Sequence, residues 1–214
     1  MADAQYQAWL WEKLGHETIE NLKKHGFAGN FLASADEGRD FVTDLVRDYN
    51  TVGFGGSATL RALDIPATLK QQGKTVYDHW DPAQEESDLS LRLKQGRCDC
   101  FICSANAISA TGEIVNVDGV GNRTNAMTFG CPNVIIVAGM NKVALDLDGA
   151  LRRIREIAAP MRAKSLNMNT PCAETGICTD CNSPQRICRI TAILHRKPMM
   201  TEVSVVLIND ALGF

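Results

Sequence analysis

Residues 101–143 read FICSANAISATGEIVNVDGVGNRTNAMTFGCPNVIIVAGMNKV, and the fold of the chain depends on this stretch. Apolar runs rich in β-branched residues flank a centre of Gly, Asn and Asp. The last run, 134–137, shows no polar alternation, which is typical of a strand buried on both faces of a sheet. The centre predicts a turn at Gly119 and Gly121, followed by Asn122 and Arg123.

This turn is a candidate binding element. Its backbone N–H groups would be exposed, and Arg123 adds a forked cation that suits a carboxylate or a phosphate. A hairpin turn with a solvated arginine explains the same residues equally well, so the sequence leaves both interpretations open.

Strands and helices alternate on both sides of this turn. The alternation from Thr51 to Ala158 predicts a mainly parallel, three-layer α/β domain behind a helical N-terminus. Periodicity and capping residues predict helices at 4–25, 35–48, 87–95 and 145–158, the last ended by Pro160, and strands at 51–54, 74–77, 190–193 and 203–208, of which the last two look like a closing pair.

A glycine-rich loop follows the predicted strand at 51–54. Gly55, Gly56 and Ser57 lead directly into a helix that contains Thr59. Glycines allow a ligand to approach the backbone, and the first N–H groups of a helix have no internal partner, so the loop is a candidate anion site with Ser57 and Thr59 as hydroxyl donors. The simpler alternative is a tight strand-to-helix turn in which Ser57 is the N-cap.

His79 follows the predicted strand at 74–77, at the end where open α/β sheets bind their ligands. Its pKa range makes it a candidate proton carrier. No partner residue is evident from the sequence, and a loop histidine without a function fits as well.

The composition argues against several classes of protein. The 22 Lys and Arg residues are balanced by 25 Asp and Glu, for a net charge of −3, so no broad nucleic-acid surface is expected. No apolar run approaches the ~20 residues of a membrane span, and the first residues do not resemble a signal peptide. A cytoplasmic location is therefore expected, where eight cysteines are more typical of ligands, redox groups or core residues than of disulfides.

The cysteines fall into two groups. Cys98, Cys100 and Cys103 lie along a predicted strand, with Cys98 and Cys100 on one face, and are expected to be small core residues. The other four are Cys172, Cys178, Cys181 and Cys188, in a segment at 170–189 that is rich in Gly, Pro and Asn.

The second group is a candidate metal centre. Flexible spacers let the four sulfurs converge, and the Cys-x2-Cys step at 178–181 is common to zinc and iron–sulfur sites. Structural zinc more often uses two such pairs, so the irregular spacing favours a [4Fe–4S] cluster, with zinc as the alternative. Arg186 and Arg189 would offset thiolate charge.

Together these motifs resemble the LUD-domain family of lactate utilisation proteins over nearly the whole chain. The resemblance is carried by GFGGSATL at 53–60, SANAI at 104–108, TGEIVNVDGVGNR at 111–123, VAGMNKV at 137–143 and the cysteine tail at 170–188. Cys131 follows Gly130 where the family tends to have proline, a departure that bears mainly on packing.

The resemblance implies the fold of the ribose-5-phosphate isomerase and CoA-transferase superfamily, a Rossmann-like three-layer sandwich, here as a single domain over residues 1–214. In that superfamily the glycine-rich loop contacts phosphate or carboxylate groups, which supports the anion-binding interpretation. CoA-transferases use a catalytic Glu, so Glu113 joins His79 as a catalytic candidate. The ligand-binding residues expected around one cleft at strand ends are Gly55, Gly56, Ser57, Thr59, Asn122, Arg123 and Lys142.

Three functions fit these expectations. The resemblance favours an iron–sulfur component of a cytosolic 2-hydroxy-acid (lactate-type) oxidation system, which binds a small anionic metabolite and needs a redox partner protein, because no flavin or nicotinamide fingerprint is visible. The alternatives are an isomerase or transferase acting on a phosphorylated or CoA-linked metabolite, with a structural metal, and a non-catalytic metabolite- or redox-sensing module. Self-association into a homo-oligomer is left open.

Overall fold

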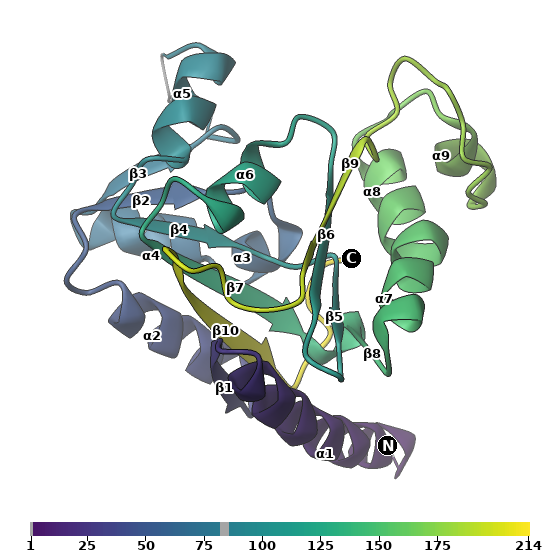
Figure 1. The fold of residues 1–214 in the computed structure, drawn as a ribbon, viewed down its shortest axis with the longest axis horizontal. Helices are drawn as coiled ribbons and strands as arrows, with labels where there is room; N and C mark the ends of the chain where they lie inside the picture. The colour runs from purple at the N-terminus through teal and green to yellow at the C-terminus, as the bar shows by residue number, and fades with distance from the viewer. Residues whose placement is uncertain (1, 82–85) are drawn as a thin grey trace.

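A six-stranded, all-parallel sheet forms the centre of the molecule (Figure 1). The structure is a computed structural model that describes residues 2–81 and 86–214. In spatial order the strands are β1 (Ala28–Leu32), β10 (Glu202–Ile208), β7 (Asn133–Gly139), β4 (Cys100–Cys103), β2 (Thr51–Phe54) and β3 (Thr75–Asp78). The continuous apolar run of β7 lies in the interior of the sheet, where both faces are covered.

Helices cover both faces of this sheet. They are α1 (Ala2–Lys24), α2 (Ala35–Leu45), α3 (Ala58–Ala62), α4 (Ile65–Gln71), α5 (Asp88–Gln95) and α6 (Asn122–Thr128). Three further helices, α7 (Leu147–Arg153), α8 (Ala159–Ser165) and α9 (Pro171–Thr175), lie outside this sheet. Val42 of α2 belongs to one core cluster with Ile135, whereas Leu22 of α1 and Met127 of α6 belong to the other with Ile136. Adjacent β7 residues thus face opposite layers, as strand geometry requires. The predicted Rossmann-like three-layer sandwich is confirmed.

A second, mixed sheet of four strands packs beside the first. Its strands are β8 (Val143–Ala144), β5 (Ala107–Ser109), β6 (Ile114–Asp118) and β9 (Ile190–Leu194). One face contributes Ile108 and Ile114 to the main core, and the other packs through Val115 against Ala150 of α7. The expected closing pair at 190–193 and 203–208 is therefore wrong: both strands exist, but β9 pairs antiparallel with β6, and β10 lies between β1 and β7.

The sequence predicts that the helix after residue 145 ends at Pro160, but the helix continues past this residue. A π-helical turn, η2 (Ile154–Ala158), joins α7 to α8, so the chain stays helical to Ser165. Pro160 has no N–H to donate to the preceding turn. The Ala159 N–H donates to the Ile154 carbonyl five residues earlier, and this wider turn accommodates the proline.

The core cysteines are buried, as predicted, but their faces differ from the prediction. Cys98 lies before β4 and joins the core cluster that contains Cys103, whereas Cys100 faces the opposite cluster. Strand alternation begins only at Cys100, so the two-residue spacing from Cys98 does not place both thiols on one face.

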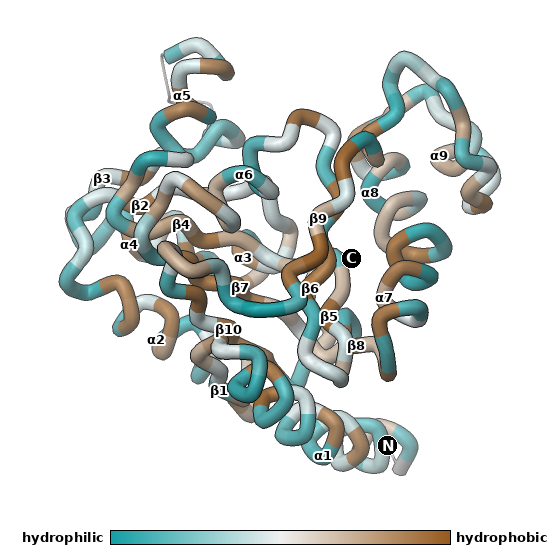
Figure 2. The backbone as a smooth tube through the Cα atoms, in the orientation of Figure 1, coloured by the Kyte–Doolittle hydropathy of each residue, from teal (hydrophilic) through white to brown (hydrophobic). Residues whose placement is uncertain are grey.

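Hydropathy follows this layering (Figure 2). Apolar segments concentrate along the strands, and the loop that follows α9 is largely hydrophilic. In Figure 1 this loop and α9 lie at the periphery beside α8, away from the central sheet. None of the described helices combines the length and apolar character that a bilayer span requires.

Candidate functional site

A cleft of about 390 Å³ lies at the edge of the sheet where the parallel strands end. Its walls include the loops that follow β2, β3, β4 and β7. The chain runs from β2 outward to β3 on one side and to β4 on the other, so the strand order reverses between β2 and β4. Open α/β sheets bind ligands at such a reversal point, outside the carboxyl ends of the strands.

The structure brings most of the sequence-predicted residues to this cleft. It is lined by Gly56, Ser57, His79, Asn122, Arg123 and Lys142. Thr59 contacts the cleft indirectly, because the Thr59 hydroxyl accepts a hydrogen bond from Lys142. Gly55 lies against the Arg123 side chain. Glu113 does not lie in the cleft: it sits at the turn between β5 and β6, where its carboxylate accepts a hydrogen bond from Thr111 Oγ1 (2.6 Å).

The glycine-rich loop shapes the floor of the cleft. Ser57 Oγ accepts the N–H of Leu60 (3.2 Å), so this hydroxyl is the N-cap of the five-residue helix α3. A Cβ at Gly56 would lie 2.6 Å from the ring of Trp80, so only glycine allows this close approach. Residues 55–58 carry no charged side chain, so the positive charge of the cleft comes from residues on other elements.

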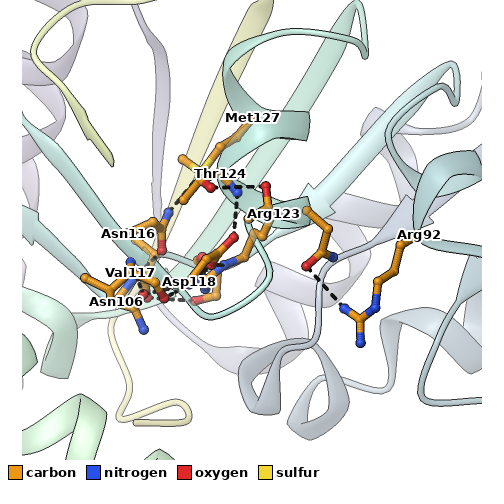
Figure 3. A network of polar contacts seen from close by, with 12 residues as sticks. Arg92, Asn106, Asn116, Val117, Asp118, Arg123, Thr124 and Met127 are labelled. Carbon is orange, nitrogen blue, oxygen red and sulfur yellow. Dashed lines mark hydrogen bonds and ion pairs between the residues drawn. The ribbon is translucent and has the colours of Figure 1, made fainter. Parts of the chain in front are cut away.

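Arg123 is the centre of a network that ties the loop after β4 to the end of β6 (Figure 3). Its Nε donates to Asp118 Oδ1 (2.9 Å), and its Nη2 donates to Asn106 Oδ1 (2.7 Å) and to the Val117 carbonyl (2.9 Å). Nη1 donates to the Ser104 carbonyl (3.3 Å). The Arg123 and Asp118 side chains are only 12% and 7% exposed, so most of this guanidinium is committed to the protein itself.

The predicted turn at residues 119–123 is the start of a helix rather than a hairpin. Gly121, at a φ of +92°, precedes α6, and Asp118 Oδ2 accepts the N–H of Thr124 (2.8 Å) in its first turn. The amide oxygen of Asn122 accepts a hydrogen bond from Arg92 (3.1 Å), which also lines the cleft. Asp118 therefore serves both the helix and Arg123.

Lys142 is a buried cation that has no ion pair with the described residues. It ends the short 3-10 helix η1 (Met140–Lys142) after β7, and its Nζ donates to Thr59 Oγ1 (2.8 Å) and Ser104 Oγ (2.9 Å). Burial, with smaller contributions from Arg153 and Arg123, lowers the pKa of Lys142 to about 7. A large fraction of this amine is therefore unprotonated at neutral pH.

Arg162 and Trp80 are site residues that the sequence interpretation missed. Arg162 on α8 stacks over the Trp80 ring, with Cζ 4.5 Å from the centroid, and Arg61 lies over the same ring at 5.7 Å. Arg162 Nη1 donates to Ser165 Oγ (3.2 Å), and Arg162 forms no ion pair within residues 2–81 and 86–214. Burial and the charge of Arg123 lower its pKa. The position of Trp80, beside His79 after a strand, was the available signal.

His79 is held by Gln95 in one tautomer. Gln95 Nε2 lies 2.9 Å from His79 Nδ1 and also donates to the Tyr77 carbonyl (3.3 Å), so Nδ1 accepts and the ring proton is assigned to Nε2. Burial and the nearby Arg92 lower the pKa of His79. The imidazole is therefore neutral at pH 7 and can donate from Nε2.

The cysteine segment borders the cleft without forming a preassembled metal site. Its four thiols are free and partly exposed, and among the described residues no group of three or more His, Cys, Asp or Glu side chains is arranged to hold an ion. Arg186 organises the loop by donating to the carbonyls of Cys181 and Cys188 (2.7 Å each) and by pairing with Asp180. The donor set suits a thiolate-bound metal group, but its sulfurs would converge only if the loop rearranged. Ile187, next to Cys188, lines the cleft.

The parallel sheet and the cleft at its carboxyl edge define a Rossmann-like α/β protein. The family model of the LUD domain matches residues 15–208, so the chain belongs to the LUD-domain family, which confirms the resemblance. The fold is also similar to the crystal structure of a DUF162 family protein from Deinococcus radiodurans, with a TM-score of 0.54 and 13% sequence identity over 92% of this chain and 98% of that one. This second likeness shows the fold alone. No curated protein matches the chain significantly.

Proposed function

We propose that the cleft binds a small carboxylate metabolite and that the protein is a component of a cytoplasmic 2-hydroxy-acid, lactate-type oxidation system. One observation carries this proposal: the partly buried Arg162 lines the cleft and forms no ion pair with the described residues. Cations removed from water need a counter-charge, and a bound carboxylate supplies one. Membership in the LUD-domain family supports a metabolite of the lactate type.

Different residues of the cleft bind different groups of the metabolite. Arg162 offers a planar fork that matches a carboxylate, and its stacking on Trp80 orients that fork. His79 Nε2 can donate a hydrogen bond to a 2-hydroxyl or 2-oxo oxygen. The hydrogen bonds of Arg123 to Asp118 and Asn106 stabilise the wall of the cleft.

The proposal includes a [4Fe–4S] cluster at Cys172, Cys178, Cys181 and Cys188, with zinc as the alternative. Four accessible thiols in one loop support it, together with the guanidinium of Arg186 between Cys181 and Cys188. The cluster, when bound, would supply one-electron transfer to a redox partner protein. The shared wall at Ile187 supports a functional connection between the cleft and the segment.

Calorimetric titration of the anaerobically purified protein tests the binding proposal. L-lactate and pyruvate should bind, and lactamide, which has the same shape without the carboxylate, should not. Equal binding of lactamide would show that the cleft does not recognise the carboxylate. Iron and acid-labile sulfide, measured on the same sample, test the cluster.

The volume of the cleft favours one second candidate. About 390 Å³ exceeds what a three-carbon acid fills, and it lies in the range of pockets for larger metabolites. An isomerase or transferase acting on a phosphorylated or CoA-linked metabolite would use the same cations. Displacement of pyruvate by a sugar phosphate, at a lower concentration than lactate needs, would favour this candidate.

A further inference from the structure

We propose that the Lys142 amine forms an imine with the carbonyl carbon of a 2-oxo acid held in the cleft. This inference rests on the proposed function, because it takes the cleft to be the carboxylate site. It adds a covalent role to a residue that would otherwise serve only through its hydrogen bonds to Thr59 and Ser104.

The geometry separates Lys142 from the other cations of the cleft. Arg123 is committed to Asp118, and Arg92 pairs with Asp88. Arg162 is held by stacking on Trp80 and keeps most of its donors available. The carboxylate therefore has a receptor in Arg162, which leaves the Lys142 amine for the neighbouring carbon.

The hydroxyls around Lys142 suit an amine that reacts. The Thr59 hydroxyl donates its proton to the Leu212 carbonyl (3.0 Å), so toward Lys142 Nζ it can only accept a hydrogen bond. Among the described residues the Ser104 hydroxyl donates only over long contacts, 3.3 Å to the Ala105 carbonyl and 3.4 Å to Thr59. Ser104 Oγ lies 2.9 Å from Nζ, so its proton can be passed to a reacting oxygen and recovered.

The step balances without any oxidant or reductant. The Nζ lone pair forms a C–N bond as the carbonyl π bond breaks, and the oxygen receives a proton through Ser104. The proton passed through Ser104 is one of the two Nζ protons, which gives a carbinolamine. Its hydroxyl takes up the second Nζ proton and leaves as water while the C=N bond forms. The net reaction is amine plus 2-oxo acid to imine plus water.

The protonation state of Lys142 supports this chemistry. Its attacking form is the neutral amine, and a pKa of about 7 makes that form abundant at neutral pH. The charged or titratable groups that affect Lys142 are Arg153, Arg123 and Cys103. Burial raises the pKa of Cys103 to about 12 and lowers the pKa of Arg153 only to about 10, so neither titrates near pH 7.

Reductive trapping tests the proposal. The purified protein is incubated with pyruvate and sodium cyanoborohydride, and the modified peptides are mapped by mass spectrometry. We expect one reduced pyruvate adduct, on Lys142, with a rate that rises with pH through about 7. Lys164, an exposed lysine on α8, is the internal control for unspecific modification. The Lys142→Met variant should lose the adduct.

The outcomes separate this inference from the proposed function. Pyruvate that binds in calorimetry but leaves Lys142 unmodified overturns the imine and leaves the carboxylate site standing. Modification of Lys164 to the same extent as Lys142 also overturns the imine. Absence of pyruvate binding overturns both proposals. Mapping the wild-type protein gives these answers even if Lys142→Met does not fold.

Discussion

The guanidinium of Arg162 lies over the indole ring of Trp80, with Cζ 4.5 Å from the ring centroid. Trp80 follows β3, whereas Arg162 lies on α8 about 80 positions later, so this contact closes the cleft between distant parts of the chain. A cation–π contact orients the charge without neutralising it. Arg162 can therefore be rigid and still pair with an incoming anion.

Arg162→Leu should weaken pyruvate binding about 10-fold to 100-fold, because a hydrogen bond to a charged group contributes roughly 1.5–3 kcal/mol. Calorimetric titration measures the change. Arg155→Leu is the matched control, since Arg155 is exposed on the same run of helix and does not line the cleft. Equal affinity of both variants would remove Arg162 from the binding site.

Arg123→Met should destabilise the protein by about 3–5 kcal/mol, the cost of leaving one partner of a buried ion pair alone. Asp118 would keep its charge at 7% exposure without its guanidinium. Urea denaturation measures this loss. The double variant with Asp118→Asn should recover part of it, because the orphaned charge is removed as well. A loss below about 1 kcal/mol, typical of exposed pairs, would contradict a structural role.

Local signals in the sequence correctly predicted the parts of the fold that depend on neighbouring residues. The predicted caps are observed: Ser34 Oγ accepts the N–H of Glu37, and Ser57 Oγ accepts that of Leu60. The apolar run at 134–137 is a strand covered on both faces. Each of these features is decided within a few residues of chain, which is why the pattern alone predicts it.

The missed features depend on tertiary contacts. Strand β1 (Ala28–Leu32) contains Gly and Asn, and it exists because it pairs with β10 at the edge of the sheet. Arg162 reaches the cleft only because a π turn carries the helix past Pro160. The sequence predicts Arg123 as a ligand-binding cation. Its pairing with Asp118 depends on how β6 and α6 pack, which the sequence pattern does not reveal. The metal ligands in the cysteine segment stay a prediction.

Lys142 should make the free energy of unfolding depend on pH above neutrality. Its pKa is lowered to about 7 in the folded state from an ordinary 10.5, so the unfolded state binds more protons between these values. The free energy of unfolding then rises with pH by up to about 1.4 kcal/mol per pH unit across this window. Below pH 7 the whole destabilisation caused by burying the protonated amine is present. Its charged or titratable neighbours are Arg153, Arg123 and Cys103. The pKa of Arg153 is about 10 and that of Cys103 about 12, so neither of these two titrates near pH 7.

Urea denaturation of wild type and Lys142→Met at pH 7, 8 and 9 measures this effect. The variant should be the more stable protein at pH 7, and its advantage should shrink as the pH rises. Groups elsewhere in the chain titrate in both proteins, so they cancel in the difference. Parallel stability curves would mean that Lys142 is not held at a lowered pKa.

Cys181→Ser should abolish the visible absorption and lower the iron content of anaerobically purified protein if the segment binds a [4Fe–4S] cluster. Serine oxygen is a poor ligand for such clusters, which thiolates hold. Thr179→Ser is the control, because it changes an exposed residue of the same loop and leaves all four thiols. Full colour and iron in Cys181→Ser would show that Cys181 is not a ligand.

Gly56→Ala should disturb the cleft through Trp80 rather than through a lost contact. The added Cβ would lie 2.6 Å from the indole ring, so the ring must move, and the stacked Arg162 with it. We expect a stability loss of roughly 1–3 kcal/mol, as for other overpacked sites. Pyruvate binding should weaken as in Arg162→Leu, although no charge is removed.

Gly96→Ala is the control, because Gly96 has a φ of −81° and its Cβ would meet nothing closer than 3.8 Å. If Gly56→Ala binds pyruvate as tightly as Gly96→Ala, the Trp80–Arg162 stack does not position the carboxylate.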